Sequence, residues 1–296
     1  MILTTDLPNI LYRGKVRETY DLGNDTLLMI ATDRISAFDV VLPAGIPTKG
    51  LILSRMSGFW FGQTSHIAPN HFISLADEAE DLIANSPVGP IPSFIASQGM
   101  VVRRAKRIDI ECIIRGYLAG SAWAEYQKLG TVFGKIMPKG LLQGTKFDEP
   151  LFTPTTKAEE GHDQNMSIPE VENLVGKQIA NELAEKSLAL YEFARDYAAE
   201  RGIILADTKL EFGYINDTVT LIDEAFTPDS SRFWDTSLYK PGSSPPNFDK
   251  QFVRDWLVEQ GWNKQPPAPA MPPEVVEKTV ARYREAYRRI TNETLA

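Results

Sequence analysis

Four charged residues lie on a stretch of alternating polar and apolar residues that is typical of a β-strand followed by a turn. Asp207, Lys209 and Glu211 occupy every second position, and Asp223 follows the turn signal. Because side chains of a strand alternate between its two faces, the first three share one face. If the turn takes three residues, 216–218, then Glu211 lies directly opposite Asp223.

Three acids on one patch repel one another unless a cation lies among them. Magnesium prefers oxygen ligands and is usually held by one or two carboxylates together with substrate phosphates. The lysine of the patch could stabilise charge on a transferred phosphoryl group. The pattern therefore indicates a magnesium nucleotide site, although spacing alone favours an ordinary solvent-exposed ladder of salt bridges.

Three further segments have the composition of anion-binding turns. In segment 13–17, Gly14 lets the backbone approach a ligand closely and Lys15 can reach phosphate oxygens. In segment 115–121 the arginine can bind a phosphate or carboxylate, and the serine could donate from the start of a helix. Segment 229–232 has a similar character. Each of the three is also compatible with an ordinary basic or capped turn.

The histidines give weaker signals. His162 lies in the polar segment 155–163, which could be a mobile flap over a ligand. His66 and His71 have no cysteine or histidine nearby at metal-ligand spacing, so we expect both to be structural. The spacing supports no Ser/His/Asp nucleophile arrangement.

Length and charge bound the class of protein. The chain has 296 residues and a net charge of -8, and this length favours two or three subdomains around one cleft. An acidic surface is poorly suited to nucleic acid, although a local cluster of basic residues can still bind a small anion. Cys112 is the single cysteine, which favours a reducing compartment. Because no secretory leader or membrane-spanning run is apparent, we expect a cytoplasmic protein.

The elements that position these residues differ along the chain. The first hundred residues are expected to be mostly strands and turns, with a hairpin around the turn at 23–25. Six prolines between residues 43 and 92 are expected to forbid long helices there. Further strands are expected at 101–107 and from residue 112 to the turn at 115–117.

Helical patterns strengthen after residue 165. Ser167 and Glu170 have the spacing of a capping box, and the apolar residues that follow predict one long helix over 167–201. Strands are predicted at 203–214 and 218–226. Two C-terminal helices, at 248–260 and 273–295, are expected to brace the core rather than take part in chemistry.

Taken in order, these segments closely resemble the SAICAR synthetase family of purine biosynthesis. The matching stretches are spread over most of residues 11–234, at 11–17, 32–39, 46–50, 110–121, 207–213 and 223–234. The chain looks like the longer, fungal-type monofunctional form. Compared with compact bacterial forms it carries extra length around 60–100, around 138–165 and at the C-terminus.

The resemblance implies a reaction and a fold. ATP, the carboxylate of carboxyaminoimidazole ribonucleotide (CAIR) and L-aspartate give the succinocarboxamide SAICAR, ADP and phosphate. The implied fold is α+β, similar to ATP-grasp and protein-kinase folds, with an ATP cleft between two lobes. The expected parts are a β-rich lobe (1–105), a mixed α/β catalytic lobe (106–234) and a helical C-terminal segment (235–296). Small-molecule substrates are expected, with no nucleic acid or membrane partner and a slight preference for a monomer.

The resemblance also implies roles for single residues. The magnesium ligands correspond to Glu211 and Asp223, with Lys209 and Asp207 as catalytic residues beside them. The nucleotide-binding positions are Gly14, Lys15, Arg17, Lys106 and Glu111, with the adenine hinge within 103–110. The CAIR-binding positions are Arg115, Ser121 and Arg232. A motif associated with aspartate or with loop structure contains Asp33, Ser36 and Asp39.

Two other functions remain compatible with the same residues. A small-molecule kinase would yield a stable phosphoester, whereas the ligase releases phosphate only when CAIR and aspartate are both present. A nucleotide-sensing protein would bind ATP without turnover, and it would leave the carboxylate cluster without a purpose.

Overall fold

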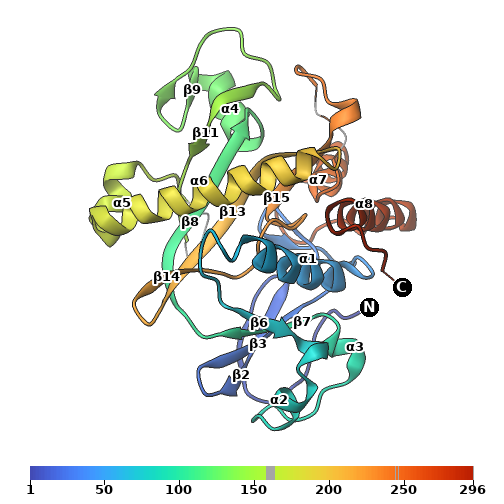
Figure 1. Cartoon of the computed structure of the whole chain (residues 1–296). Coiled ribbons are helices and arrows are strands. Elements are labelled where there is room, and N and C mark those ends of the chain that lie inside the picture. Colours follow the sequence, from blue (N-terminus) through green and yellow to red (C-terminus); the bar gives the residue numbers. More distant parts are fainter. Residues whose placement is uncertain (158–163, 244, 246, 296) are drawn as a thin grey trace.

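The chain folds into two large antiparallel β-sheets with helices packed on and around them (Figure 1). The computed structural model describes residues 1–157, 164–243, 245 and 247–295, and the predicted flap residue His162 lies outside these ranges. None of the helices in these ranges combines the length and apolarity that a bilayer crossing needs. The predicted α+β class, with helices at the C-terminus, is confirmed.

The N-terminal sheet has five strands in the order β1-β2-β3-β7-β6. They are β1 (Ile10–Arg13), β2 (Arg17–Gly23), β3 (Thr26–Ala31), β6 (Phe72–Leu75) and β7 (Gly99–Arg103). β2 and β3 form the predicted hairpin, and Asn24 and Asp25 take positive φ at its turn, 49° and 56°. Such turns match the twist of the flanking strands, which is why this residue pair marks a hairpin in sequence.

Helix α1 (Lys49–Thr64) contradicts the expectation that prolines exclude long helices from this region. Pro47 lies before its first turn and Pro69 lies beyond its end, so neither ring interrupts a helical hydrogen bond. The helix packs against β3, β6, β7 and the C-terminal helix α8 (Pro273–Thr291). Its buried side chains, such as Trp60, lie in the main core.

The second sheet is built on two long strands, β8 (Lys106–Tyr117) and β13 (Ile203–Ile215), which pair antiparallel. Their register places Asp207 opposite Arg115 and Glu211 opposite Glu111. The other strands are β11 (Lys146–Phe152), β12 (Thr155–Thr156), β14 (Thr218–Ile222) and β15 (Ser231–Asp235). Charged residues from two distant parts of the sequence therefore become neighbours.

The hairpin after β13 differs from its prediction. Its turn takes two residues, 216–217, rather than three, so Glu211 lies opposite Ile222 and not opposite Asp223. β14 ends at Ile222 rather than at residue 226, because Asp223 takes a φ of 66° that is incompatible with an extended strand. Asp223 therefore lies on the loop just beyond the strand.

Helices α5 (Ile168–Val175) and α6 (Lys177–Ala199) replace the single helix predicted over 167–201. Gly176 separates them with φ 83° and ψ 151°, a conformation that glycine adopts without steric cost and a helix does not contain. The predicted capping box of Ser167 and Glu170 is confirmed. α6 covers one face of the second sheet against β8 and β13 (Figure 1).

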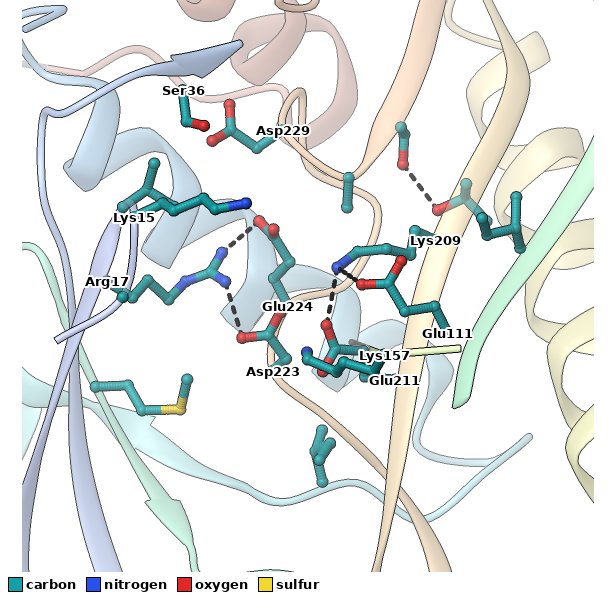
Figure 2. A pocket seen from close by; sticks show the side chains of 18 of the residues that line it. Lys15, Arg17, Ser36, Glu111, Lys157, Lys209, Glu211, Asp223, Glu224 and Asp229 are labelled. Carbon is teal, nitrogen blue, oxygen red and sulfur yellow. Dashed lines mark hydrogen bonds and ion pairs between the residues drawn. The ribbon is translucent and has the colours of Figure 1, made fainter. Parts of the chain in front are cut away.

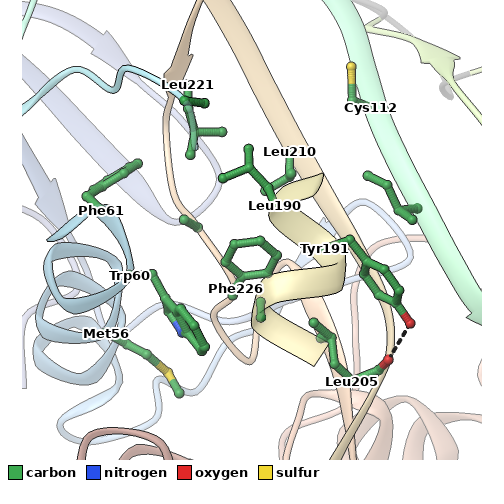
Figure 3. Close-up of a cluster of buried hydrophobic side chains, with 14 of the residues drawn as sticks. Met56, Trp60, Phe61, Cys112, Leu190, Tyr191, Leu205, Leu210, Leu221 and Phe226 are labelled. Carbon is green, nitrogen blue, oxygen red and sulfur yellow. Dashed lines mark hydrogen bonds between the residues drawn. The ribbon is translucent and has the colours of Figure 1, made fainter. Parts of the chain in front are cut away.

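One continuous apolar core joins the two sheets. Figure 3 shows part of it, where the rings of Trp60 and Phe226 lie 5.2 Å apart. Leu210 and Phe212 are fully buried in this core, which confirms the predicted apolar face of β13. The core contains residues on both sides of positions 105 and 234, and the division into lobes at these positions remains a prediction.

Helix α7 (Gln251–Glu259) precedes α8, and both C-terminal helices are shorter than predicted. Val253 and Leu257 of α7 pack against apolar residues of the segment 35–46. The shorter elements are β4 (Ser36–Ala37), β5 (Val40–Val41), η1 (Ala76–Glu78), α2 (Glu80–Ala84), α3 (Ser93–Ala96), α4 (Gly120–Leu129), β9 (Thr131–Val132), β10 (Lys135–Ile136) and η2 (Thr236–Leu238).

Candidate active site

A cavity of about 1050 Å³ lies between the two sheets. Its walls come from β2 and β3 on one side, from β8 and β13 on the other, and from the loop after β14. Drug-sized ligands occupy pockets of roughly 300–1,000 Å³, so this cavity has room for more than one substrate. The predicted site residues that line it are Gly14, Lys15, Arg17, Ser36, Asp39, Glu111, Arg115, Ser121, Asp207, Lys209, Glu211, Asp223 and Arg232.

Lys209 and Glu211 occupy the middle of the cavity wall (Figure 2). Lys209 Nζ donates to Glu111 and to Glu211 at 2.8 Å each, and Lys157 donates to the other oxygen of Glu211. Burial raises the pKa of Glu211, which is 3% exposed, but Lys209 and Lys157 outweigh it and lower the pKa to about 2. Burial lowers the pKa of Lys209, whereas Glu211 and Glu111 raise it well above its ordinary value. Both groups are therefore charged at neutral pH.

Asp223 and Glu224 face this centre from the loop after β14. Arg17 of β2 donates to Asp223 at 2.8 Å and pairs with Glu224, as Figure 2 shows. Burial lowers the pKa of Arg17, but the two carboxylates raise it above its ordinary value. His71 is buried close by, and burial lowers its pKa to about 4, so its imidazole is neutral at pH 7. The two carboxylates therefore share the guanidinium group of Arg17.

Asp207 lies between two arginines at the other end of the charged face of β13. Arg115 donates to it at 3.2 Å, and Arg232 donates to the same oxygen. Arg115 also donates to the hydroxyl of Ser121 in the first turn of α4, at 3.1 Å. Burial lowers the pKa of Arg115 to about 10 and Asp207 opposes this change, so the guanidinium stays charged. Two guanidinium groups against one carboxylate leave a net positive charge that suits a phosphate or carboxylate ligand.

The turn at Gly14 lies beside the β4–β5 hairpin at one edge of the cavity. Lys15 donates to Asp39, and Ser36 lines the cavity near them. Asp33, which the sequence grouped with these residues, does not line the cavity. Its carboxylate accepts backbone N–H bonds from the chain start and from the first turn of α1, at 2.6 and 2.9 Å. Asp33 therefore has the structural role that the motif left open.

The predicted adenine hinge contributes Arg103, Ala105 and Arg107 to the lining, whereas Lys106 is exposed and outside it. Lys106 pairs through its backbone with Tyr214 at the start of β8. Apolar side chains opposite the charged wall form a slot of a kind that suits an aromatic base, and they include Leu27 and Met29 of β3.

His71, which the sequence predicted to be structural, also lines the cavity. Several other lining residues were not predicted from the sequence: Lys157, Glu224, Asp249, Lys250 and Arg254. Asp249 and Lys250 come just before α7 and Arg254 comes from its first turn, so the C-terminal segment contributes to the cavity lining as well as packing on the core. Lys250 and Arg254 are four residues apart at a helix start, which was a local signal for a shared face. Nothing local indicated that this face turns towards β13.

Acidic groups, clustered cations and an apolar slot in one large cavity define a nucleotide-using enzyme with room for a second anionic substrate. The family model for SAICAR synthetase matches residues 10–269. The chain belongs to the SAICAR synthetase family. The activity predicted from the sequence, ATP-dependent formation of an amide bond between CAIR and L-aspartate in purine biosynthesis, is the activity of that family.

The relatives match over nearly their whole length. Phosphoribosylaminoimidazole-succinocarboxamide synthase from Chromobacterium violaceum is 50% identical over 95% of this chain and 97% of its own. The synthase from Actinobacillus succinogenes is 51% identical over 93% of this chain and 95% of its own. The solved SAICAR synthase of Saccharomyces cerevisiae, complexed with SAICAR, superposes with a TM-score of 0.88 at 40% identity and full coverage of both chains. A SAICAR synthetase in complex with ADP gives a TM-score of 0.71 at 25% identity, over 97% of this chain and 99% of its own. The longer form therefore occurs in bacteria as well as in yeast.

Proposed function

We propose that this cavity joins CAIR to L-aspartate by way of an acyl phosphate, with ATP as the phosphoryl donor. The observation that carries the proposal is the position of Lys209 between Glu111 and Glu211 in the cavity wall. A fixed ammonium group can balance charge while a phosphoryl group moves, without reorganising at the moment of reaction.

Glu211 and Asp223 are the proposed ligands of Mg²⁺. Among the residues that the structure describes, no group of three or more His, Cys, Asp or Glu side chains forms a complete metal cage. A pair of carboxylates, with substrate oxygens and water for the other positions, is the donor set that Mg²⁺ prefers, so these residues fit the ion. When bound, the ion would neutralise phosphate oxygens of ATP and polarise the γ-phosphoryl group.

The two substrates with phosphate groups occupy different cation clusters in this proposal. Lys15 and Arg17, with the backbone at Gly14, contact the phosphates of ATP, and Glu111 contacts its ribose. Adenine lies against the apolar slot, along the backbone of 103–106. Lys106 takes part in nucleotide binding through this backbone. The CAIR phosphate is bound by Arg115, Ser121 and Arg232. Asp207 holds the two arginines in place, and Arg115 donates to the hydroxyl of Ser121.

The chemistry proceeds in two steps. A carboxylate oxygen of CAIR attacks the γ-phosphorus in line, and the new O–P bond forms as the bond to ADP breaks. The amine of aspartate then attacks the acyl carbon, a C–N bond forms, and the C–O bond to phosphate breaks. The protons of the amine pass to the departing phosphate or to a wall carboxylate. Lys209 stabilises the oxyanion and the departing phosphate.

The composition supports a proposal about the cellular location and the partners of the enzyme. The single cysteine and the charge of -8 favour a cytoplasmic protein with no nucleic acid or membrane partner. A monomer is the expected assembly, with Ser36 and Asp39 as candidate contacts for aspartate.

Product analysis tests the proposal. The enzyme with ATP and Mg²⁺ should release phosphate only when CAIR and aspartate are both present, with a product of the mass of SAICAR. A stable phosphoester would indicate a kinase instead, and binding without turnover would indicate a sensor. The Glu211→Gln variant should lose turnover and keep its circular dichroism spectrum. Near-normal activity in that variant would remove the metal assignment.

A further inference from the structure

Arg34 holds the turn at Gly14 from outside the cavity lining. Its guanidinium group donates to the carbonyl of Gly14 and to the carbonyl of Lys15, at 2.9 Å in each case. The carbonyl of Val16 accepts the backbone N–H and the hydroxyl of Thr32, at 2.9 and 2.8 Å. Three successive carbonyls of the turn are therefore bound by two residues that follow β3.

The same bonds orient the backbone N–H groups of the turn. A trans peptide plane points a carbonyl and the next N–H in opposite directions, so the N–H groups of Lys15 and Val16 point away from Arg34. Within the described ranges, neither of these N–H groups donates a hydrogen bond to another protein group. Successive N–H groups of a turn can form a concave site for an anion. Since Lys15 and Val16 line the cavity, the two N–H groups can bind a phosphate there.

A buried carboxylate anchors Arg34. Glu18 of β2 is fully buried, and its carboxylate accepts from Arg34 at 2.8 Å. It also accepts the backbone N–H and the hydroxyl of Thr5, at 2.9 and 2.5 Å. Burial raises the pKa of Glu18, but the bonds from Thr5 and Arg34 outweigh it and hold the pKa below its ordinary value. Arg34 donates to the carbonyl of Leu3 as well, so its guanidinium group is fixed by four acceptors.

We propose that Arg34 is a positioning residue for the nucleotide, which fixes the turn 14–16 in the shape that binds phosphate without itself contacting ATP. The inference rests on the proposed function, in which this turn contacts the phosphates of ATP. A guanidinium group suits the task because it is planar and presents five donors in a rigid arrangement. An ammonium group has three donors and cannot meet all four acceptors together.

Arg34→Lys separates positioning from a purely structural role. Lysine keeps a charge beside Glu18, but the carbonyls of Gly14 and Lys15 lose their planar donor. KM for ATP should rise by roughly tenfold to a hundredfold, as for the loss of one hydrogen bond to a charged group. KM for CAIR and KM for aspartate should stay unchanged. A purely structural loss would lower kcat through the fraction of folded enzyme and would leave every KM unchanged.

Binding of ATP and of adenosine, each without CAIR and aspartate, separates this inference from the proposed function. The unchanged enzyme should bind ATP much more tightly than adenosine, and Arg34→Lys should lose most of that difference while its affinity for adenosine stays the same. Equal affinities for ATP and adenosine in the unchanged enzyme would refute the proposed phosphate contacts. If Lys15→Met weakens the binding of ATP and Arg34→Lys does not, the positioning role alone fails.

Two further variants control for loss of the fold. Arg34→Met combined with Glu18→Gln removes both charges, so no buried carboxylate is left unpaired, and it should show the same rise in KM for ATP. Arg289→Lys is the matched control, because Arg289 also joins a carbonyl, that of Gly202 at 3.3 Å, to a carboxylate, that of Asp235 at 3.1 Å. Arg289 does not line the cavity, so all three KM values should stay unchanged. A normal KM for ATP in either test variant would overturn the positioning role, and so would an equal rise in the control.

Discussion

Lys209 donates from one ammonium group to Glu111 on β8 and to Glu211 on its own strand, at 2.8 Å in each case. The two bonds hold the charge at a fixed place in the cavity wall, where the proposed mechanism develops negative charge during phosphoryl transfer. We predict that Lys209→Met lowers kcat roughly 100- to 1,000-fold, which is typical for the loss of one such stabilising group. The release of phosphate under saturating substrates measures this change.

Lys186→Met is the control for that variant. Lys186 donates to the carbonyl of Val219 at 2.7 Å and pairs with Glu182, both outside the cavity. Its loss should leave kcat close to that of the unchanged enzyme. Equal losses in the two variants would mean that general destabilisation, and not a missing charge in the site, explains the effect.

We predict that Lys157 competes with a divalent cation for the carboxylate of Glu211. Lys157 donates to Glu211, one of the two proposed metal ligands. Lys157→Met should therefore bind Mn²⁺ more tightly in the absence of nucleotide, by roughly threefold to tenfold for a partly exposed ion pair. Electron paramagnetic resonance of free Mn²⁺ measures the affinity. Unchanged or weaker binding would exclude this competition.

The predictable part of the site is the part that depends on local geometry. The shared face of Asp207, Lys209 and Glu211 follows from the two-residue period of a strand, and the structure shows all three in one cavity. The predicted pairing of Glu211 with Asp223 is wrong, because the turn takes two residues. The positive φ of Asp223 also ends β14 early. No periodic pattern encodes the backbone conformation of a single residue.

Elements that depend on distant contacts were the least predictable. α1 begins just after Pro47, in a region where the prolines predict no long helix. Its burial depends on β3, β7 and α8. Lys250 and Arg254 reach the cavity because α7 packs on the segment 35–46 and Asp249 binds the backbone of β15. These contacts join parts of the chain that are far apart in sequence.

Gly116 of β8 leaves space for the hydroxyl of Tyr191, which donates to the carbonyl of Leu205 at 2.7 Å (Figure 3). A Cβ atom at Gly116 would lie 2.1 Å from that hydroxyl oxygen. Gly116→Ala should therefore lower the free energy of unfolding by roughly 1–3 kcal/mol through overpacking. Tyr191→Phe should lower it by roughly 1–2 kcal/mol, because a buried carbonyl loses its donor.

The two changes should not add, because phenylalanine lacks the oxygen that the new methyl group would strike. We expect the double variant to lose less free energy of unfolding than the sum of the single variants, by at least about 0.5 kcal/mol. Urea unfolding of the unchanged protein, both single variants and the double variant measures this coupling. Strict additivity would mean that β8 shifts to accept the alanine and that the space beside Gly116 is not fixed by Tyr191.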